Sequence, residues 1–120
     1  MAIYFLTNAP KDLLGKFDVA IAQTKPEGKI TTWVKSEDGK YYTHKSEQYG
    51  KKAWLKPVIL TNRLAFNILR PQNANISTPV YGYYHGHLIE TFINHFGKSF
   101  TEGSATALPA SGDNCSATSK

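Results

Sequence analysis

The sequence has 120 residues, of which 41% are apolar and 12% aromatic, and its formal net charge is +5 at pH 7. This length suits one domain with its own hydrophobic core. A single cysteine, Cys115, excludes a disulfide framework and a thiolate metal cluster. No run of about 18 apolar residues and no signal-peptide core follows Met1, so we expect a cytoplasmic protein with no membrane partner.

The positive charge favours an anionic partner, but its distribution argues against nucleic acid. Twelve of the fourteen cationic residues are lysines, and no run is longer than Lys51-Lys52. Scattered lysines most often form a solvated face. Arg63 and Arg70 are more informative, because a guanidinium fork matches phosphate oxygens and stacks on bases. We therefore expect a small anionic ligand rather than a nucleic acid.

The first third of the chain predicts strands and one short helical turn. Residues 2–7 are β-formers, a bend follows at Asn8-Ala9-Pro10, and Leu13 and Leu14 suit a helical turn. Alternation over residues 18–24 predicts a second strand. Residues 29–36 and 40–44 flank Asp38-Gly39 and predict a hairpin, whose type I′ turn requires positive φ at both central residues.

The middle of the chain is the most apolar part. A polar loop is expected over 45–53, and Pro57 and Asn62-Arg63 interrupt the apolar run that follows. These interruptions favour two strands, 58–61 and 64–69, although the apolar spacing also permits a helix.

A helix is predicted from Gly86 to the cap residue Gly97, with a core stripe made by Leu88, Ile89, Phe92, Ile93 and Phe96. A short final strand is expected within 99–108. The prediction is an α+β fold, with a mostly antiparallel sheet in the N-terminal two-thirds followed by one main C-terminal helix. Residues 1–108 form one domain, and 109–120 form a low-complexity tail with little to pack.

The stretch VYGYYHGHLIETFINHFGKSF, residues 80–100, gathers three of the four histidines. His85 and His87 would face one metal on a strand but diverge by about 200° on a helix. Only Glu90 lies near enough to be a third ligand, so we expect no metal and no other cofactor. A helix that begins at Gly86 would instead offer free N–H groups to an anion.

Side chains of this stretch suit a nucleotide. Tyrosine rings can stack on a base, and an exposed asparagine can read an adenine edge. Core packing and a solvated helix face are the plain alternatives, and a lone histidine acting on a phosphodiester is a third. The candidate ligand-binding residues are Tyr83, Tyr84, His85, His87, Asn94, Arg63 and Arg70.

Two pieces of the chain resemble the viral ring nucleases. These are IYFLTNAPKDLLGKF, residues 3–17, and the pair Gly86-His87, which matches a Gly-His pair that leads a helix in that family. The resemblance implies a metal-independent ring nuclease that cleaves a cyclic oligonucleotide with His87 as general acid or base.

The order of elements and the segment YYHGHLIETFINHFGKSF resemble the Thoeris anti-defence sponge proteins of phages. That resemblance implies sequestration of a cyclic ADP-ribose isomer without cleavage, assembly into a homodimer or larger homo-oligomer, and residence in the host cytoplasm. The leading hypothesis is a phage-type protein that binds a cyclic nucleotide immune signal. The alternatives are the ring nuclease and a protein-binding inhibitor that uses its tyrosines as an interface.

Overall fold

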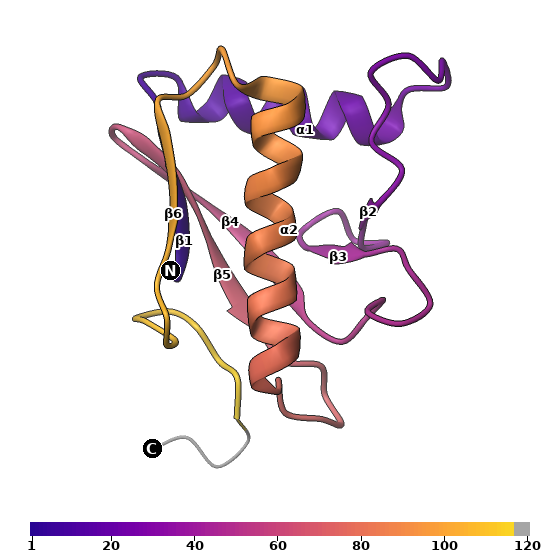
Figure 1. Ribbon diagram of the computed structural model, residues 1–120, viewed down its shortest axis with the longest axis vertical. Coiled ribbons are helices and arrows are strands. Elements are labelled where there is room, and N and C mark those ends of the chain that lie inside the picture. Colours follow the sequence, from indigo (N-terminus) through magenta and orange to yellow (C-terminus); the bar gives the residue numbers. More distant parts are fainter. Residues whose placement is uncertain (117–120) are drawn as a thin grey trace.

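The computed structural model describes residues 1–116 and has two helices and one six-stranded sheet (Figure 1). The α+β class is confirmed. In chain order the elements are β1 (Ile3–Leu6), α1 (Pro10–Ala22), β2 (Trp33–Lys35), β3 (Tyr42–His44), β4 (Trp54–Leu60), β5 (Arg63–Leu69), α2 (Thr78–Phe96) and β6 (Glu102–Ala105).

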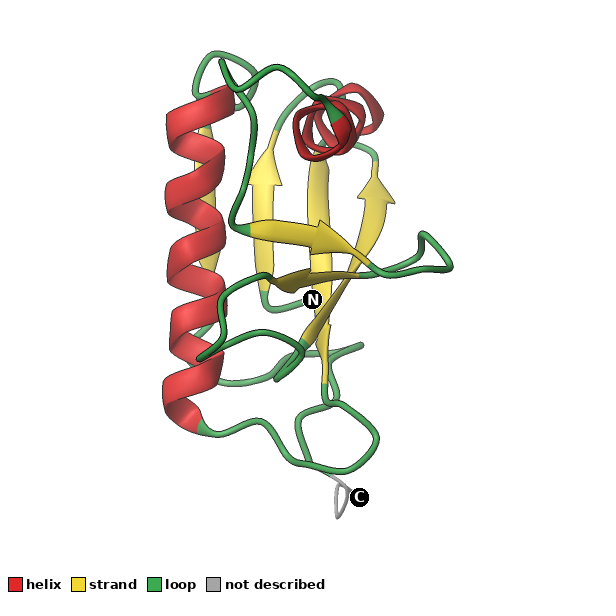
Figure 2. Cartoon of the chain, turned by 90° about the vertical axis from the view of Figure 1, so that its right-hand side faces the viewer, coloured by secondary structure: helices red, strands yellow, loops and turns green. Residues whose placement is uncertain are grey.

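The sheet has the strand order β2-β3-β4-β5-β1-β6, and all neighbouring strands are antiparallel. β1 lies between β5 and β6, so the two ends of the domain meet in the sheet (Figure 1). In Figure 2, α2 runs along one side of the sheet and α1 crosses near one end of the strands. This arrangement places the C-terminal end of α2 close to α1.

Aromatic rings fill the space between the sheet and the helices. Phe5 of β1 stacks on Phe92 of α2 with ring centroids 4.2 Å apart, and Phe66 and Phe17 pack edge-on or tilted against the same group. All four rings are fully buried. Burying one such ring contributes about 1.5–3 kcal/mol, so this group anchors both helices.

Helix α1 replaces a predicted strand. Its buried residues Leu13, Phe17 and Ala20 recur at helical spacing, and the stripe carries the helix through residues 18–22. The strand predicted over 18–24 is therefore wrong, and Val19, one of its alternating residues, is 65% exposed. Asp18 fixes the helix to the hairpin, because its carboxylate accepts a hydrogen bond from the Tyr42 hydroxyl.

The β2–β3 hairpin is confirmed, but its turn differs from the prediction. Gly39 has φ +76°, whereas Asp38 is not among the residues with positive φ. Ser36 N–H donates to the Tyr41 carbonyl at 2.8 Å, which closes a longer turn than type I′. Inside it the Asp38 carboxylate accepts from the Ser36 hydroxyl and from the Lys40 N–H.

β4 and β5 confirm the two-strand interpretation of the apolar middle. They pair over seven residues each, and β4 begins at Trp54, earlier than predicted. β4 runs through Pro57, which was expected to interrupt it. β3 pairs with β4 only at Leu55, so no strand lies beside Pro57 on the β3 side. The N–H that proline lacks therefore costs no hydrogen bond on that side.

Helix α2 begins at Thr78, eight residues before the predicted start. The Ser77 side chain caps it by accepting a hydrogen bond from the Val80 N–H at 3.3 Å. This first part was not predicted because its glycines and tyrosines have weak helix propensity. Packing against the sheet overrides that weak propensity. Gly97 follows the helix as predicted, although its φ of −58° is right-handed.

The buried stripe of α2 also differs from the prediction. Ile93 is 56% exposed and does not belong to the core. Tyr84 and His85 take core positions instead, beside Leu88 and Phe92. Two of the predicted ligand residues therefore serve the interior of the protein.

The predicted final strand is confirmed as β6, and the chain beyond it returns to the end of β5. Asn114 accepts from the Arg70 N–H at 2.7 Å and donates to the Ile68 carbonyl at 2.9 Å. The buried Asp113 carboxylate accepts from the Ile68 N–H at 2.9 Å. The segment up to Ser116 thus has more to pack than expected, while residues 117–120 of the predicted tail lie outside the described residues. The division at residue 108 stays a prediction.

Candidate functional site

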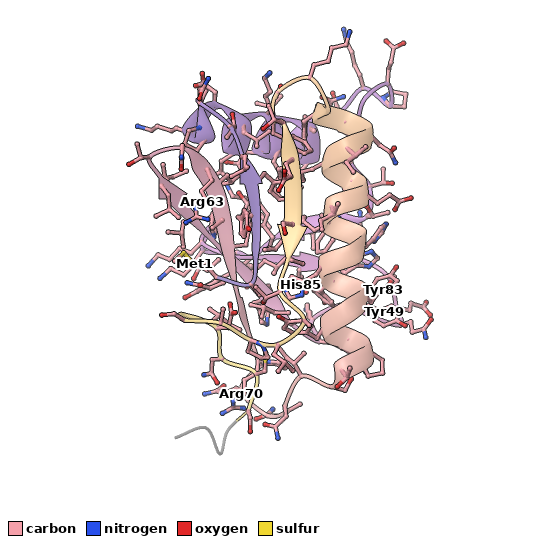
Figure 3. All side chains as sticks on the ribbon, turned by 60° about the vertical axis from the view of Figure 1, so that its left-hand side comes forward. Met1, Tyr49, Arg63, Arg70, Tyr83 and His85 are labelled. Atoms are coloured by element: carbon pink, nitrogen blue, oxygen red, sulfur yellow. The ribbon has the colours of Figure 1, made fainter. Side chains whose placement is uncertain are left out.

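The predicted ligand residues do not converge on one place. Tyr83 and His87 lie together on one side of α2, and the exposed Asn94 lies near its C-terminal end. Figure 3 shows Arg63, Arg70 and Tyr83 on three separate parts of the molecule. Each therefore has to be assessed by its own contacts.

Tyr84 is a structural residue. Its ring is completely buried, and its hydroxyl donates to the Tyr49 carbonyl. The same hydroxyl lies 3.1 Å from the Thr43 hydroxyl oxygen. These bonds tie α2 to β3 and to the loop after it, and they leave no polar atom of Tyr84 for a ligand.

His85 is 2% exposed, and neither ring nitrogen has a hydrogen-bond partner. Burial lowers the pKa of His85, which keeps the ring neutral at neutral pH. On the helix the two side chains diverge: His85 packs against Tyr81, whereas His87 packs against Trp33 and His44, so the two rings do not share a site. Within residues 1–116, no group of three or more His, Cys, Asp or Glu side chains is placed to hold a metal ion.

The two arginines are held by protein groups. The Arg63 guanidinium lies 4.9 Å from the centre of the Tyr4 ring, in a cation–π contact on the sheet. Arg70 Nη1 donates to the carbonyls of Pro71 at 3.0 Å and Gln72 at 3.2 Å. Neither arginine contacts Tyr83 or His87.

The anion site predicted at Gly86 is also wrong. Because α2 begins at Thr78, Gly86 lies in the third turn, where its N–H belongs to the helical ladder. The free N–H groups are at Ser77 and Thr78 instead, away from the histidines.

A chain of hydrogen bonds joins β3 to α2, and we call His44, Ser46, His87 and Glu90 the histidine cluster. His44 Nε2 lies 2.7 Å from His87 Nδ1. His87 Nε2 lies 3.3 Å from Glu90 Oε1 on the next turn of α2. At the other end, the Ser46 hydroxyl is 3.0 Å from His44 Nδ1.

The tautomers of both rings follow from these bonds. The Ser46 N–H donates to His44 Nδ1 at 3.2 Å, so that nitrogen is an acceptor and Nε2 carries the proton. His44 Nε2–H then donates to His87 Nδ1, and His87 Nε2–H donates to Glu90. A metal-binding histidine needs a ring nitrogen whose lone pair is free, and here both acceptor nitrogens, His44 Nδ1 and His87 Nδ1, already accept N–H groups. The bonding thus favours a proton chain over a metal site.

Burial is the main reason that His44 stays neutral. The side chain is 3% exposed, and burial, assisted by the neighbouring His87, lowers its pKa to about 4. The outer end of the chain is more open, because the side chain of His87 is 21% exposed and that of Glu90 is 63% exposed. The His87–Glu90 end of the chain is therefore the more open to solvent.

Two tyrosines flank this outer end. Tyr49 and Tyr83 stack with ring centroids 3.7 Å apart and an interplanar angle of 6°. Both rings are partly exposed, and the Tyr83 hydroxyl lies 3.4 Å from His44 Nε2. Sequence reasoning missed His44 and Tyr49, since they meet α2 only through the pairing of β3 and no local motif marks them.

A large hollow lies elsewhere, between α1 and the C-terminal end of α2. Its volume is about 890 Å³, and we call it the basic groove. Cationic and titratable side chains on its walls are Lys11, Asp12, Lys16, His95 and Lys98. An adjoining hollow of about 540 Å³ is lined by Asn94 together with Lys16 and Lys98.

The lysines of the basic groove are not neutralised by the protein. Within residues 1–116, Lys11, Lys16 and Lys98 form no ion pair. Lys16 donates to the Ser99 hydroxyl at 2.7 Å, which holds its ammonium at the groove. Asp12 is the only carboxylate on the described walls, so the groove has a net positive charge.

No protein-family model, curated protein or solved structure matches the chain. The two family resemblances drawn from the sequence therefore remain predictions. Neither described helix is both long enough and apolar enough to cross a membrane. The geometry of the histidine cluster and of the basic groove is what any functional proposal must use.

Proposed function

We propose that this protein binds and sequesters a small cyclic nucleotide signal, a cyclic ADP-ribose isomer or a cyclic oligonucleotide, in the basic groove and leaves it uncleaved. The observation that carries the proposal is the set of three lysines without ion-pair partners around one hollow. The nucleotide class and the role in evading host defence come from the family resemblance.

The size and chemistry of the groove suit such a ligand. Small-molecule sites commonly measure about 300–1,000 Å³, and the groove falls in this range. Ammonium groups at Lys16 and Lys98 would bind phosphate oxygens as point charges. Asn94, beside both lysines, has the donor and acceptor needed to read a base edge.

The groove walls favour retention over cleavage. Cleaving a phosphodiester requires an acid or base that is held in place by a further group. His95 is the only histidine on the described walls, and no hydrogen bond or ion pair within residues 1–116 orients its ring. In the histidine cluster, hydrogen bonds do orient the rings, but no residue of the cluster lines the groove.

The direct test is to load the protein with cyclic ADP-ribose or a cyclic dinucleotide, denature it by heat and identify the released compound by mass spectrometry. We expect the intact ligand at the input mass. Recovery of a linear product would contradict sequestration. Native mass spectrometry of the same sample also reads the subunit number, for which we propose a homodimer or larger homo-oligomer.

The matched variants are K16Q with K98Q in the groove and K56Q outside it. Lys56 is exposed on β4 and lines no part of the groove. We expect the double variant to weaken binding at least about tenfold, since charge-assisted hydrogen bonds are worth about 1.5–3 kcal/mol each. K56Q should bind as the unchanged protein does.

The second candidate function is a metal-independent ring nuclease that uses His87. It is favoured by the position of His87, whose Nε2 faces the exposed Glu90 and would exchange a proton with a substrate that displaced that carboxylate. Under this proposal, H87A abolishes turnover of a cyclic oligonucleotide and spares binding. Unchanged turnover in H87A would remove His87 from the role.

A further inference from the structure

A separate small pocket lies where the tip of the β2–β3 hairpin meets the start of β4 and the end of β5. Its volume is about 280 Å³. The pocket is lined by Ser36, Tyr41, Trp54, Leu69 and Arg70. None of these residues lines the basic groove or belongs to the histidine cluster.

The walls of the pocket are aromatic and aliphatic. Trp54 and Leu69 are direct partners in the β4–β5 ladder, so their side chains share one face of the sheet. Trp54 is only partly buried, whereas Trp33 is 1% exposed. Tyr41 supplies a second aromatic ring from the residue that precedes β3. Flat apolar walls of this kind suit a planar ring.

Arg70 gives the pocket a fixed positive charge. Its Nη1 atom donates to the carbonyls of Pro71, Gln72 and Ala74 at 3.0–3.3 Å, which locks the guanidinium in place. Its Nε atom is buried and has no acceptor among residues 1–116. No carboxylate of residues 1–116 forms an ion pair with Arg70. Arg70 therefore brings to the pocket wall a positive charge that no described carboxylate neutralises.

We propose that this pocket binds a small planar aromatic carboxylate, with its ring against Trp54 and Tyr41 and its carboxylate on Arg70. The carbonyls occupy Nη1 and Nε is buried, so Nη2 is the guanidinium nitrogen left for a charge-assisted bond to the carboxylate. The pocket lies just below the usual size range of ligand sites and is too small for a cyclic dinucleotide. This activity is independent of the proposed nucleotide site.

The test is a titration of ¹⁵N-labelled protein with naphthalene-2-carboxylate, followed through the two tryptophan indole N–H signals. Trp33 Nε1 donates to the Thr91 hydroxyl at 3.0 Å inside the core and serves as the internal reference. We expect the Trp54 signal to shift and saturate while the Trp33 signal stays in place. Naphthalene-2-carboxamide, the neutral analogue, should bind at least about tenfold more weakly, because it lacks the charge.

The matched variants are R70Q and R63Q. Arg63 stacks on Tyr4 and does not line the pocket, so R63Q should bind like the unchanged protein, whereas R70Q should lose at least about tenfold in affinity. An unmoved Trp54 signal, or equal binding of carboxylate and carboxamide, would overturn the proposal. That comparison needs no variant, so it decides the matter even if R70Q fails to fold.

Discussion

The histidine cluster and the basic groove differ in how far their polar side chains are bonded to other protein groups. In the cluster, His44 and His87 use both ring nitrogens in bonds to protein groups. In the groove, Lys11 and Lys98 form no ion pair within residues 1–116. The first region is satisfied by the fold itself, and the second leaves its charge for something else to bind.

This difference separates stability from recognition. A buried polar chain with all its partners in place makes the pairing of β3 with α2 specific, and it is costly to break. Uncompensated surface charge adds little to stability, but it attracts an anion. The buried His44 and His85 and the bonded His87 thus support the fold, whereas Lys11, Lys16 and Lys98 line the candidate binding site.

The largest effect on stability should come from removing Phe92, the buried ring that anchors α2. Both regions include residues of this helix. Phe92 is fully buried and stacks on Phe5, so F92A should lower the free energy of unfolding by about 3–5 kcal/mol, measured by urea denaturation. I93A, one position further and 56% exposed, is the matched control and should cost well under half as much. Equal losses would mean that the buried face of α2 is misassigned.

Lowering the pH should reduce the free energy of unfolding through the buried His44 of the histidine cluster. The folded pKa of His44 is about 4, below the unfolded value near 6.5, so the unfolded state binds more protons between these pH values. Stability is therefore fully present above about pH 6.5 and declines as the pH falls towards 4, by up to about 3 kcal/mol from this residue. Urea denaturation at pH 7 and pH 4.5 measures the decline.

The control for this pH dependence is a second histidine. H44Q should flatten the pH profile in part, since His85, whose pKa is also lowered by burial, still contributes in the same direction. H95Q removes an exposed histidine and should leave the profile as it was. If both variants behaved alike, the buried position of His44 would not be the cause.

The smallest effect should come from the exposed end of the cluster. E90Q removes the partner of His87 Nε2, but this pair lies at the surface, so the change in unfolding free energy should be below about 1 kcal/mol. The same variant should leave both rings in the Nε2–H form, because the Ser46 N–H still fixes His44. Nitrogen chemical shifts of the two rings measure this, and an Nδ1–H form of His44 would refute the proposed chain.

Local patterns were sufficient for much of the fold. The hairpin at Gly39, the two strands around Asn62-Arg63 and the helix ending before Gly97 each carry a short-range signal in residue type. The strand predicted at 18–24 failed, since Val19 and Ile21 alternate with alanines that fit either period. There the long-range packing of Phe17 decided the outcome.

The candidate site was much less predictable. His44 and His87 are 43 positions apart and meet only because β3 packs beside α2. The same holds for Lys16 and Lys98, which the end of α2 brings to α1. That the ligand is anionic stays a prediction, and the tyrosines and arginines chosen to bind it are spread over the molecule.

We propose that the basic groove binds a phosphate-bearing nucleotide through Lys11, Lys16 and Lys98. Isothermal titration of cyclic ADP-ribose and a cyclic dinucleotide into the unchanged protein and the K16Q/K98Q variant, each at low and high salt, tests it most directly. We predict that one of these ligands binds, and that its affinity falls both with salt and in the variant. Binding that is unaffected by the double variant, or no binding of either ligand, would contradict the account.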